Sequence, residues 1–371
     1  MKGAEKLKKG DPNALESYSQ WKLMLLRFRR HKLATISFFL LALMYFSAAF
    51  ADFIVPHKAS EHNKSMLFAP PTVIFFADKD GFSLRPFTYP LKVSRNPDTL
   101  QMEYELDREK RDYIDFFVHG YEYKLLGLFP SDIHLFGARD GTHIHLFGTN
   151  GMGKDIFSAT VVGSRVSLTI GLVSIMISLT LGIIIGGAAG FFGGLLDNVI
   201  QRFIEILRSV PDIPLWMALS AAIPPNWPIL HTYLAITIIL SFMGWTDMAR
   251  VVRGKFLSLR EEDFVIAAKL SGVNEWGIIL KHLVPSFMSY IITSATLAIP
   301  GMILGETALS FLGLGIRSPA VSWGVLLQDG QNVFSLTNAP WILIPGLFVI
   351  VTILLFNFMG DGLRDAADPY I

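Results

Sequence analysis

Long apolar segments constrain this chain more than any other feature of its sequence. A helix needs roughly 20 consecutive apolar residues to cross the hydrocarbon core of a bilayer. Five segments clearly approach or exceed this length: Leu33–Val55, Val166–Phe192, Ile229–Met248, Phe287–Gly305 and Trp341–Met359. The composition agrees, because 51% of the 371 residues are hydrophobic and only 17% are charged. The sequence therefore predicts an all-α polytopic membrane protein.

A sixth segment, Val199–Ile223, is apolar but interrupted. Its charged residues and prolines are Arg202, Glu205, Arg208, Pro211, Asp212 and Pro214. Glu205 lies three residues from each arginine, so these charges can pair on one helical face near the membrane interface. We count this segment as a sixth span, because omitting it would place two strongly basic segments on opposite sides of the membrane.

Lysines and arginines in short loops indicate the orientation, because cytoplasmic loops carry an excess of them. They are dense in the tail 1–32 and in the segment after the fourth span, but scarce in Pro224–Leu230 and Glu306–Pro340. Six spans with both termini in the cytoplasm satisfy this pattern. The predicted organisation is a tail (1–32), a first span (33–55), an extracytoplasmic insertion and outer loop (56–160), the remaining spans (161–359) with a cytoplasmic loop (250–285), and a tail (360–371).

The insertion, His57–Phe147, is too polar to cross a membrane, and prolines divide its short apolar runs, so we predict a folded extracytoplasmic cap. No set of residues typical of a catalytic centre stands out in the sequence. His143 and His145 share one face of a strand-like run and His134 is nearby, but a metal site needs a third ligand in suitable geometry. We therefore expect no metal, and an enzyme site in the insertion is the alternative that these histidines leave open.

The stretch GTNGMGKD, Gly148–Asp155, matches the phosphate-binding loop G-x-x-x-x-G-K-[ST] at every position except the last. There the motif needs a hydroxyl that coordinates Mg²⁺, whereas Asp155 adds a carboxylate that repels phosphate. The predicted topology also places the stretch on the outer side, away from cytoplasmic ATP. We therefore exclude nucleotide binding and expect no cofactor in this chain. The net charge of +1 gives no support for binding nucleic acid.

Glycines recur at every fourth residue in the second span, at Gly182, Gly186, Gly190 and Gly194. Small residues at this spacing line one face of a helix and allow another helix to approach closely. We expect this face to pack against a neighbouring helix rather than to contact a substrate.

The most informative cytoplasmic segment is FVIAAKLSGVNEWGIILKHLVP, Phe264–Pro285. It predicts two short helices joined at Gly272, which can adopt a left-handed turn, with Asn274 capping the second helix. We call this segment the elbow. Such an apolar element in a solvated loop indicates either a docking site for a partner, with Glu261 in its polar rim, or an amphipathic hairpin that lies on lipid. The residues alone leave both interpretations open.

Several motifs, in this order, resemble one family. Ala267-Ala268, Gly272, His282 and Pro285 resemble the EAA loop of ABC importer permeases, which couples them to their ATPase subunits. The stretches GTNGMGKDIFSATVVGSRVSLTIG, FLGLGIRSPAVSWGVLL and GDGLRDAADP resemble further segments of the dipeptide, oligopeptide and nickel permease group, in its second, C-type subunit. Together these motifs cover most of residues 148–369.

The resemblance implies a type I ABC importer permease fold with six transmembrane helices and the insertion between the first two. It implies a non-catalytic, multi-pass subunit of the bacterial inner (cytoplasmic) membrane, which forms half of the pathway for peptides or peptide-like solutes. The partners that it implies are a homologous second permease subunit, two ATPase subunits that bind ATP and Mg²⁺, a periplasmic or lipoprotein substrate-binding protein, and membrane lipid.

Two sets of site residues follow from the resemblance. The residues expected to couple to the ATPase are Glu261, Phe264, Ala267, Ala268, Gly272, Asn274, His282 and Pro285. The residues expected at the docking surface for the binding protein are Gly148, Thr149, Asn150, Gly153, Asp155 and Trp323. Ile266 stands where the family has the glutamate that names the EAA loop, so Glu261 or Glu262 is the acid available to replace it. The alternative substrates are oligosaccharides, opines and nickel, and the rival mechanism is a channel or secondary transporter without an ATPase.

Overall fold

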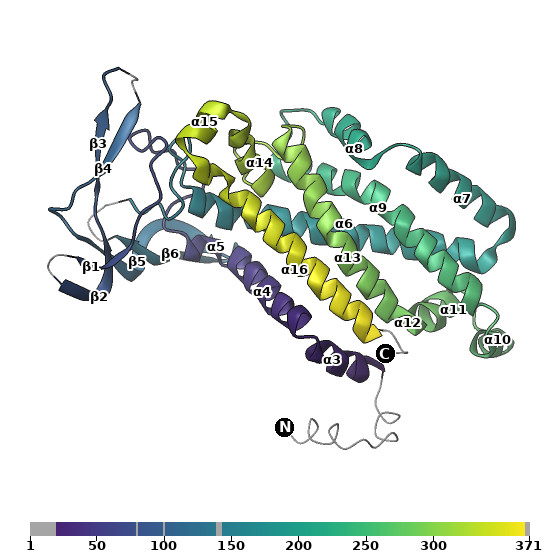
Figure 1. Ribbon diagram of the computed structural model, residues 1–371. Helices are drawn as coiled ribbons and strands as arrows, with labels where there is room; N and C mark the ends of the chain where they lie inside the picture. The colour runs from purple at the N-terminus through teal and green to yellow at the C-terminus, as the bar shows by residue number, and fades with distance from the viewer. Residues whose placement is uncertain (1–19, 79–80, 99–100, 139–142, 368–371) are drawn as a thin grey trace, which may run out of the picture.

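The computed structural model describes residues 20–78, 81–98, 101–138 and 143–367, which form a helical bundle with β-structure at one end (Figure 1). The predicted cytoplasmic tails lie partly outside this range, namely residues 1–19, with Lys2, Lys6, Lys8 and Lys9, and residues 368–371. The helices are α3 (Gln20–Arg30), α4 (Lys32–Ala49), α5 (Ala51–Ile54), α6 (Ile156–Phe192), α7 (Gly194–Arg208), α8 (Asp212–Ala221), α9 (Ile229–Leu259), α10 (Asp263–Leu270), α11 (Glu275–Ile278), α12 (Val284–Ser286), α13 (Met288–Phe311), α14 (Trp323–Leu327), α15 (Val333–Asn338) and α16 (Ile344–Ala367).

Within the described residues, five helices are long and apolar enough to cross a membrane. They are α4, α6, α9, α13 and the unit formed by α16 with the 3₁₀ turn before it, Pro340–Leu343. Each lies over one of the five clear apolar segments of the sequence. Four are longer than the apolar segments, because α6 begins at Ile156, α9 continues to Leu259, α13 continues to Phe311 and α16 continues to Ala367.

The sixth segment is broken in the middle. α7 ends at Arg208, and α8 begins directly after Pro211, whose ring nitrogen has no hydrogen to donate to a preceding turn. Figure 1 shows the two helices following each other along the bundle beside α9. Arg253 of α9 donates to both carboxylate oxygens of Asp197, and Arg208 pairs with Asp247 of α9. Two short helices held to α9 thus stand where we expected one continuous span.

Small side chains let α6 and α9 pack closely along the bundle. A methyl group on Gly186 would collide with the carbonyl oxygen of Ala249, so the two backbones touch there. The hydroxyl of Ser178 donates to the carbonyl oxygen of Ser241 at 3.2 Å. The hydroxyl of Ser241 in turn donates to the carbonyl oxygen of Ser174 at 3.1 Å. Close backbones and hydroxyl bonds between helices are the interactions that hold helices together in an apolar solvent.

The predicted glycine ridge accounts for this contact. Gly182, Gly186 and Gly190 all face residues of α9, whereas Gly194 begins α7 and has open space where a side chain would stand. Three of the four glycines therefore serve helix packing, as the sequence indicated.

The first and second spans are joined near the strands. Arg165 of α6 donates to the carbonyl oxygen of Ala48 at 2.7 Å and to the carboxylate of Asp52 at 2.7 Å. Its guanidinium thus binds the last turn of α4, where carbonyl groups are available to partners outside the helix.

The insertion and the elbow lie at opposite ends of the bundle. Met24 and Phe28 of α3 form a buried cluster with Ala34 of α4 and Ala366 at the end of α16. Figure 1 places this contact and α10–α12 at one end and the strands at the other. The predicted topology requires this separation.

The all-α expectation describes the bundle and not the insertion, which folds as antiparallel β-structure. One sheet has the strand order β1–β2–β5–β6, and β3 and β4 form a separate hairpin. The rings of Phe75, Phe87 and Tyr89 pack together, and Asp78 accepts hydrogen bonds from Tyr89 and Arg111. The strands are β1 (Phe75–Asp78), β2 (Gly81–Thr88), β3 (Leu91–Arg95), β4 (Met102–Leu106), β5 (Asp112–Leu125) and β6 (Phe129–Ala138).

Replacing Gly186 by alanine should destabilise the chain by about 1–3 kcal/mol, because the added methyl group forces α6 and α9 apart. Gly254→Ala is the matched control, since Gly254 lies in α9 with open space around it. There the change should be neutral or should stabilise the chain by about 0.5–1 kcal/mol. The midpoint of thermal unfolding in detergent measures both variants, and equal midpoints would contradict a tight contact between the two helices.

Candidate functional site

The elbow is present at the end of the bundle away from the strands (Figure 1). After α10, Gly272 has φ +77°, which is the left-handed turn predicted from the sequence. The side-chain oxygen of Asn274 accepts a hydrogen bond from the N–H of Gly277 at 2.7 Å, which confirms the predicted cap of α11. A π-helical turn, Ile279–Leu283, then leads to Pro285 and α13. No local pattern of residues predicts that wider turn.

The elbow is fixed to the ends of two long helices. Val265 and Ala268 of α10 are buried in a cluster that includes Phe256 of α9. The ammonium of Lys269 lies 5.1 Å from the centre of the Phe191 ring, at the end of α6. Because α10 packs against both α9 and α6, a force on the elbow acts on both helices.

The outer surface of the elbow is apolar and exposed. Leu270 is 85% exposed, and Phe264, Ile266, Trp276 and Leu280 are also exposed. Large apolar side chains gathered on a solvated element are typical of a surface that another molecule covers.

The predicted coupling residues lie mostly on this outer surface. Ala268 faces the interior and His282 is half-buried. Ile266, in place of the expected glutamate, is exposed one helical turn from Leu270, so this point of the surface is apolar rather than charged. The exposed members of the set are Glu261, Phe264, Ala267, Gly272, Asn274 and Pro285.

At the other end of the bundle, the outer loop Gly148–Asp155 is bound into the chain. The hydroxyl of Thr149 accepts from the N–H of Ala69 at 2.8 Å and donates to the carbonyl oxygen of Met66. The indole of Trp341 donates to the carbonyl oxygen of Thr149 at 2.9 Å. The loop thus joins the insertion to the 3₁₀ turn that precedes α16.

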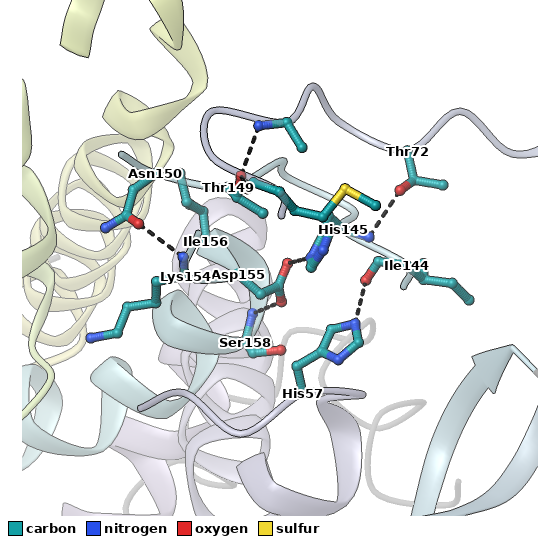
Figure 2. Close-up of polar contacts among 12 residues, drawn as sticks. His57, Thr72, Ile144, His145, Thr149, Asn150, Lys154, Asp155, Ile156 and Ser158 are labelled. Carbon is teal, nitrogen blue, oxygen red and sulfur yellow. Dashed lines mark hydrogen bonds and ion pairs between the residues drawn. The ribbon is translucent and has the colours of Figure 1, made fainter. Parts of the chain in front are cut away.

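The rest of the loop is equally constrained. Gly153 has φ +72°, and a methyl group there would collide with the carbonyl oxygen of Asn63. Asn150 accepts from the N–H of Lys154 at 2.9 Å and donates to Asp329 at 2.7 Å (Figure 2). Burial lowers the pKa of Lys154, and the nearby carboxylate of Asp329 opposes this shift. The glycines and the lysine therefore serve contacts within the chain.

Asp155 fixes the start of α6. One carboxylate oxygen accepts from the N–H of Ser158 at 2.8 Å, which caps the helix, and the other lies 3.0 Å from Nδ1 of His145 (Figure 2).

Trp323 lies in the interior, where it connects three elements. Its backbone N–H donates to the hydroxyl of Ser167 at 3.1 Å, and its indole donates to the carbonyl oxygen of Thr160 at 3.0 Å. Ser167 in turn donates to the carboxylate of Glu306, which is fully buried and also accepts from Ser310. These bonds join α6, α13 and α14.

The six residues expected at the docking surface are all buried: Gly148, Thr149, Asn150, Gly153, Asp155 and Trp323. Their contacts are within the chain. A docking protein would touch this loop through the exposed Gly151 and Met152 instead.

The histidines of the insertion are grouped differently from the sequence expectation. His134 is buried, and its Nε2 lies 3.1 Å from the carbonyl oxygen of Tyr121, away from the others. His57 instead joins His143 and His145 in a cluster that could hold a metal ion. Burial lowers the pKa of His57 to about 4 and also lowers that of His143, so both rings are neutral at neutral pH. Sequence reasoning missed His57 because the whole insertion separates it from its neighbours.

A cavity of about 270 Å³ lies within the bundle, between α6, α8, α9 and α13. Its lining contains charges of both signs, from Arg208, Asp212 and Asp247, among apolar groups that include Trp216 and Met243. Arg208 and Asp212 belong to the interrupted segment Val199–Ile223, and both of these charged residues line the cavity.

Comparison with known proteins identifies the family. The profile of binding-protein-dependent transport system inner membrane components matches residues 178–371, which include α9, the elbow, α13 and the described part of α16. The profile of the N-terminal TM domain of oligopeptide transport permease C matches residues 19–71. This chain belongs to the binding-protein-dependent inner membrane transport components. The resemblance read from the elbow is thereby confirmed at the level of the family.

Individual permeases are similar over much of the chain. The oligopeptide transport system permease protein OppC of Haemophilus influenzae is 42% identical over 226 residues, which are 61% of this chain and 70% of that protein. The OppC protein of Escherichia coli K12 is 41% identical over 61% of this chain and 72% of its own length. The dipeptide transport system permease protein DppC of Lactococcus lactis subsp. cremoris is 32% identical over 92% of this chain and 88% of its own. A solved chain of the inward-facing MetNI methionine ABC transporter is 19% identical over 56% of this chain and 96% of that chain, with a TM-score of 0.43.

Replacing Gly272 by valine should open the elbow of this permease. No atom lies within 4 Å of the position of the added Cβ, so the only cost is the left-handed backbone, about 1–2 kcal/mol for a residue with a side chain. Gly272→Asn is the matched control, because asparagine tolerates this conformation better. The rate of tryptic cleavage at Lys269 and Lys281 measures the opening. Valine should raise it and asparagine should raise it much less, and equal rates for the two variants would contradict the strain.

Proposed function

We propose that this chain is the C-type permease subunit of an ATP-driven importer that brings peptides across the bacterial inner membrane. The observation that best supports this proposal is the exposed apolar surface of the elbow. The elbow packs on α9 and α6, and the chain belongs to this permease family. One of two ATPase subunits covers that surface, the pair binds ATP and Mg²⁺, and the permease itself carries out no chemistry. A lipid-bound hairpin is the weaker interpretation, because Glu261, Glu262 and Asp263 are exposed beside the apolar surface and anionic lipid repels them.

The elbow acts as a lever in this proposal. Val265 and Ala268 hold α10 against Phe256 of α9, so closure of the ATPase pair moves α9 with the elbow. α9 and α13 both line the cavity that contains Asp247. Their displacement changes which side of the membrane the cavity opens to, and ATP hydrolysis thereby drives transport.

The remaining partners follow from the two ends of the bundle. Both termini and the elbow lie in the cytoplasm, and the insertion and Met152 face a periplasmic or lipoprotein substrate-binding protein. A homologous second permease subunit completes the pathway, since one chain provides only one side of it, and lipid surrounds the exposed apolar faces of the spans.

A peptide is the substrate that we favour. The relatives that match at about 40% identity are named for oligopeptide and dipeptide transport. A peptide carries an ammonium at one end and a carboxylate at the other. In the cavity Asp212 offers a charge for the ammonium, and Arg208 would bind the carboxylate by exchanging its partner Asp247 for it. An oligosaccharide could only hydrogen-bond to these groups and has no charges to pair with them, and nickel would use the carboxylates alone.

Replacing Leu270 by aspartate should prevent the ATPase from binding and abolish ATP-driven peptide uptake, because a buried unpaired charge at an interface costs several kcal/mol. Leu84→Asp is the matched control, since Leu84 is 88% exposed and belongs to β2, at the end of the bundle away from the elbow. Co-purification of the ATPase in mild detergent and uptake of a labelled peptide into proteoliposomes measure the two effects. If Leu270→Asp retains the ATPase, the elbow is not its docking surface.

The same proteoliposomes separate the proposal from its rival. Without ATP, uptake should fall to the level of liposomes that lack the complex. Uptake by this chain alone, without ATP and without an ATPase, would identify a channel or secondary transporter instead.

A further inference from the structure

Three imidazoles converge at the outer end of the bundle. His57 follows α5, and His143 and His145 precede the loop that leads to α6, so the insertion joins the two segments. The ring of His57 lies 5.0 Å from that of His145 and 5.4 Å from that of His143, between ring centres. If one nitrogen is taken from each of the three rings, these three nitrogens lie within 4.8 Å of one another. Figure 2 shows His57 and His145 close together, with Asp155 beside His145.

The bonds of His145 determine which of its nitrogens is free. Nδ1 lies 3.0 Å from an oxygen of Asp155, whose other oxygen is held by the N–H of Ser158. A carboxylate accepts hydrogen bonds, so Nδ1 donates here, and Nε2 is the nitrogen left to bind another group. Nε2 is buried, and it has no hydrogen-bond partner within the part of the chain that the structure describes, although His145 is only 3% exposed. A buried acceptor left without a partner is costly, so the position indicates that something else binds it.

His57 is oriented in the same way. Its Nε2 lies 3.1 Å from the carbonyl oxygen of Ile144, which only accepts hydrogen bonds, so Nε2 carries the proton and Nδ1 carries a lone pair. Histidines that bind metals almost always donate their second ring nitrogen to a carboxylate or a backbone carbonyl. His145 has the first kind of partner and His57 the second.

We propose that His57, His143 and His145 bind one divalent transition-metal ion, Zn²⁺, with solvent as the fourth ligand. Two nitrogens that each lie about 2.1 Å from a tetrahedral ion are about 3.4 Å apart, so the rings must approach one another, and His143 is the exposed ring of the three. Imidazole ligands suit zinc and disfavour the hard ions Mg²⁺ and Ca²⁺, which prefer oxygen ligands. The carboxylate of Asp155 beside His145 adds the negative charge that favours a cation.

The ion has a structural consequence for the permease. It joins the residue that follows the first span to the residues that precede the second, at the two ends of the insertion. Asp155 orients one ligand and caps α6 with the same carboxylate, so the metal site and the start of the second span form one unit. Metal binding therefore fixes how the insertion stands on the bundle, independently of the ATPase and of the substrate.

The experiment uses the full chain purified in detergent through a tag without histidine, stripped with chelator and titrated with Zn²⁺ or with Co²⁺, whose visible absorption reports a tetrahedral site. The chain has no cysteine, so no thiolate competes for the metal. We expect about one ion per chain and a raised thermal unfolding midpoint in its presence. His143→Gln is the decisive variant, because His143 is exposed and its replacement leaves the fold intact. It should weaken binding about 10-fold or more, as should His57→Gln and His145→Gln.

His62→Gln is the matched control, since His62 is exposed in the same outer segment and belongs to no cluster, and it should bind the ion as the unaltered chain does. Asp155→Asn should weaken binding about 10- to 100-fold, because its single acceptor oxygen cannot serve both His145 and the helix cap. If His143→Gln and His145→Gln bind Zn²⁺ as tightly as His62→Gln, the site does not exist. Loss of peptide uptake without a change in metal affinity bears on the proposed function alone, so the two failures are distinguishable.

Discussion

The close contact between α6 and α9 is the constraint on which the rest of the structure depends. A bilayer offers no hydrophobic drive between helices, so their association depends on backbone proximity and on hydroxyl bonds. Gly186 against Ala249 provides the first, and Ser178 with Ser241 provides the second. α6 is 37 residues long, about 56 Å of helix, and reaches from the outer loop to the elbow. The contact between α6 and α9 therefore connects the two ends of the molecule.

Each end of this pair of helices is fixed to another part of the chain. At the outer end, Asp155 caps α6 and the loop around Thr149 secures the insertion. At the inner end, Val265 and Lys269 attach the elbow to α9 and α6. The proposed lever needs a firm attachment, and the buried apolar cluster under the elbow is the contact that would provide it. On the cavity side of the bundle, α7 and α8 are separate short helices, and ion pairs join α7 to α9.

The sequence specified what depends on local chemistry. Apolar segments located five spans, the spacing of glycines located the helix contact, and Gly272 and Asn274 located the elbow, because each signal lies within a few residues. It did not specify the β-fold of the insertion, although the alternation in Met102–Leu106 is typical of a strand, because short runs between prolines are ambiguous without their partners. Nor could it reveal the burial of Trp323 or the contact of His57 with His145, because both depend on contacts between segments far apart in the chain.

The central claim is that a cytoplasmic ATPase covers the elbow, and one reactive thiol tests it most directly. Because the chain contains no cysteine, Leu270→Cys and Met152→Cys each introduce a single thiol, one at each end of the bundle. A membrane-impermeant maleimide is applied to sealed vesicles of either orientation, with and without the ATPase subunits. The account predicts that Cys at position 270 reacts only from the cytoplasmic side and is protected by the ATPase, while that at 152 reacts only from the outer side. Reaction at 270 from the outer side, or equal reaction with and without the ATPase, would contradict it.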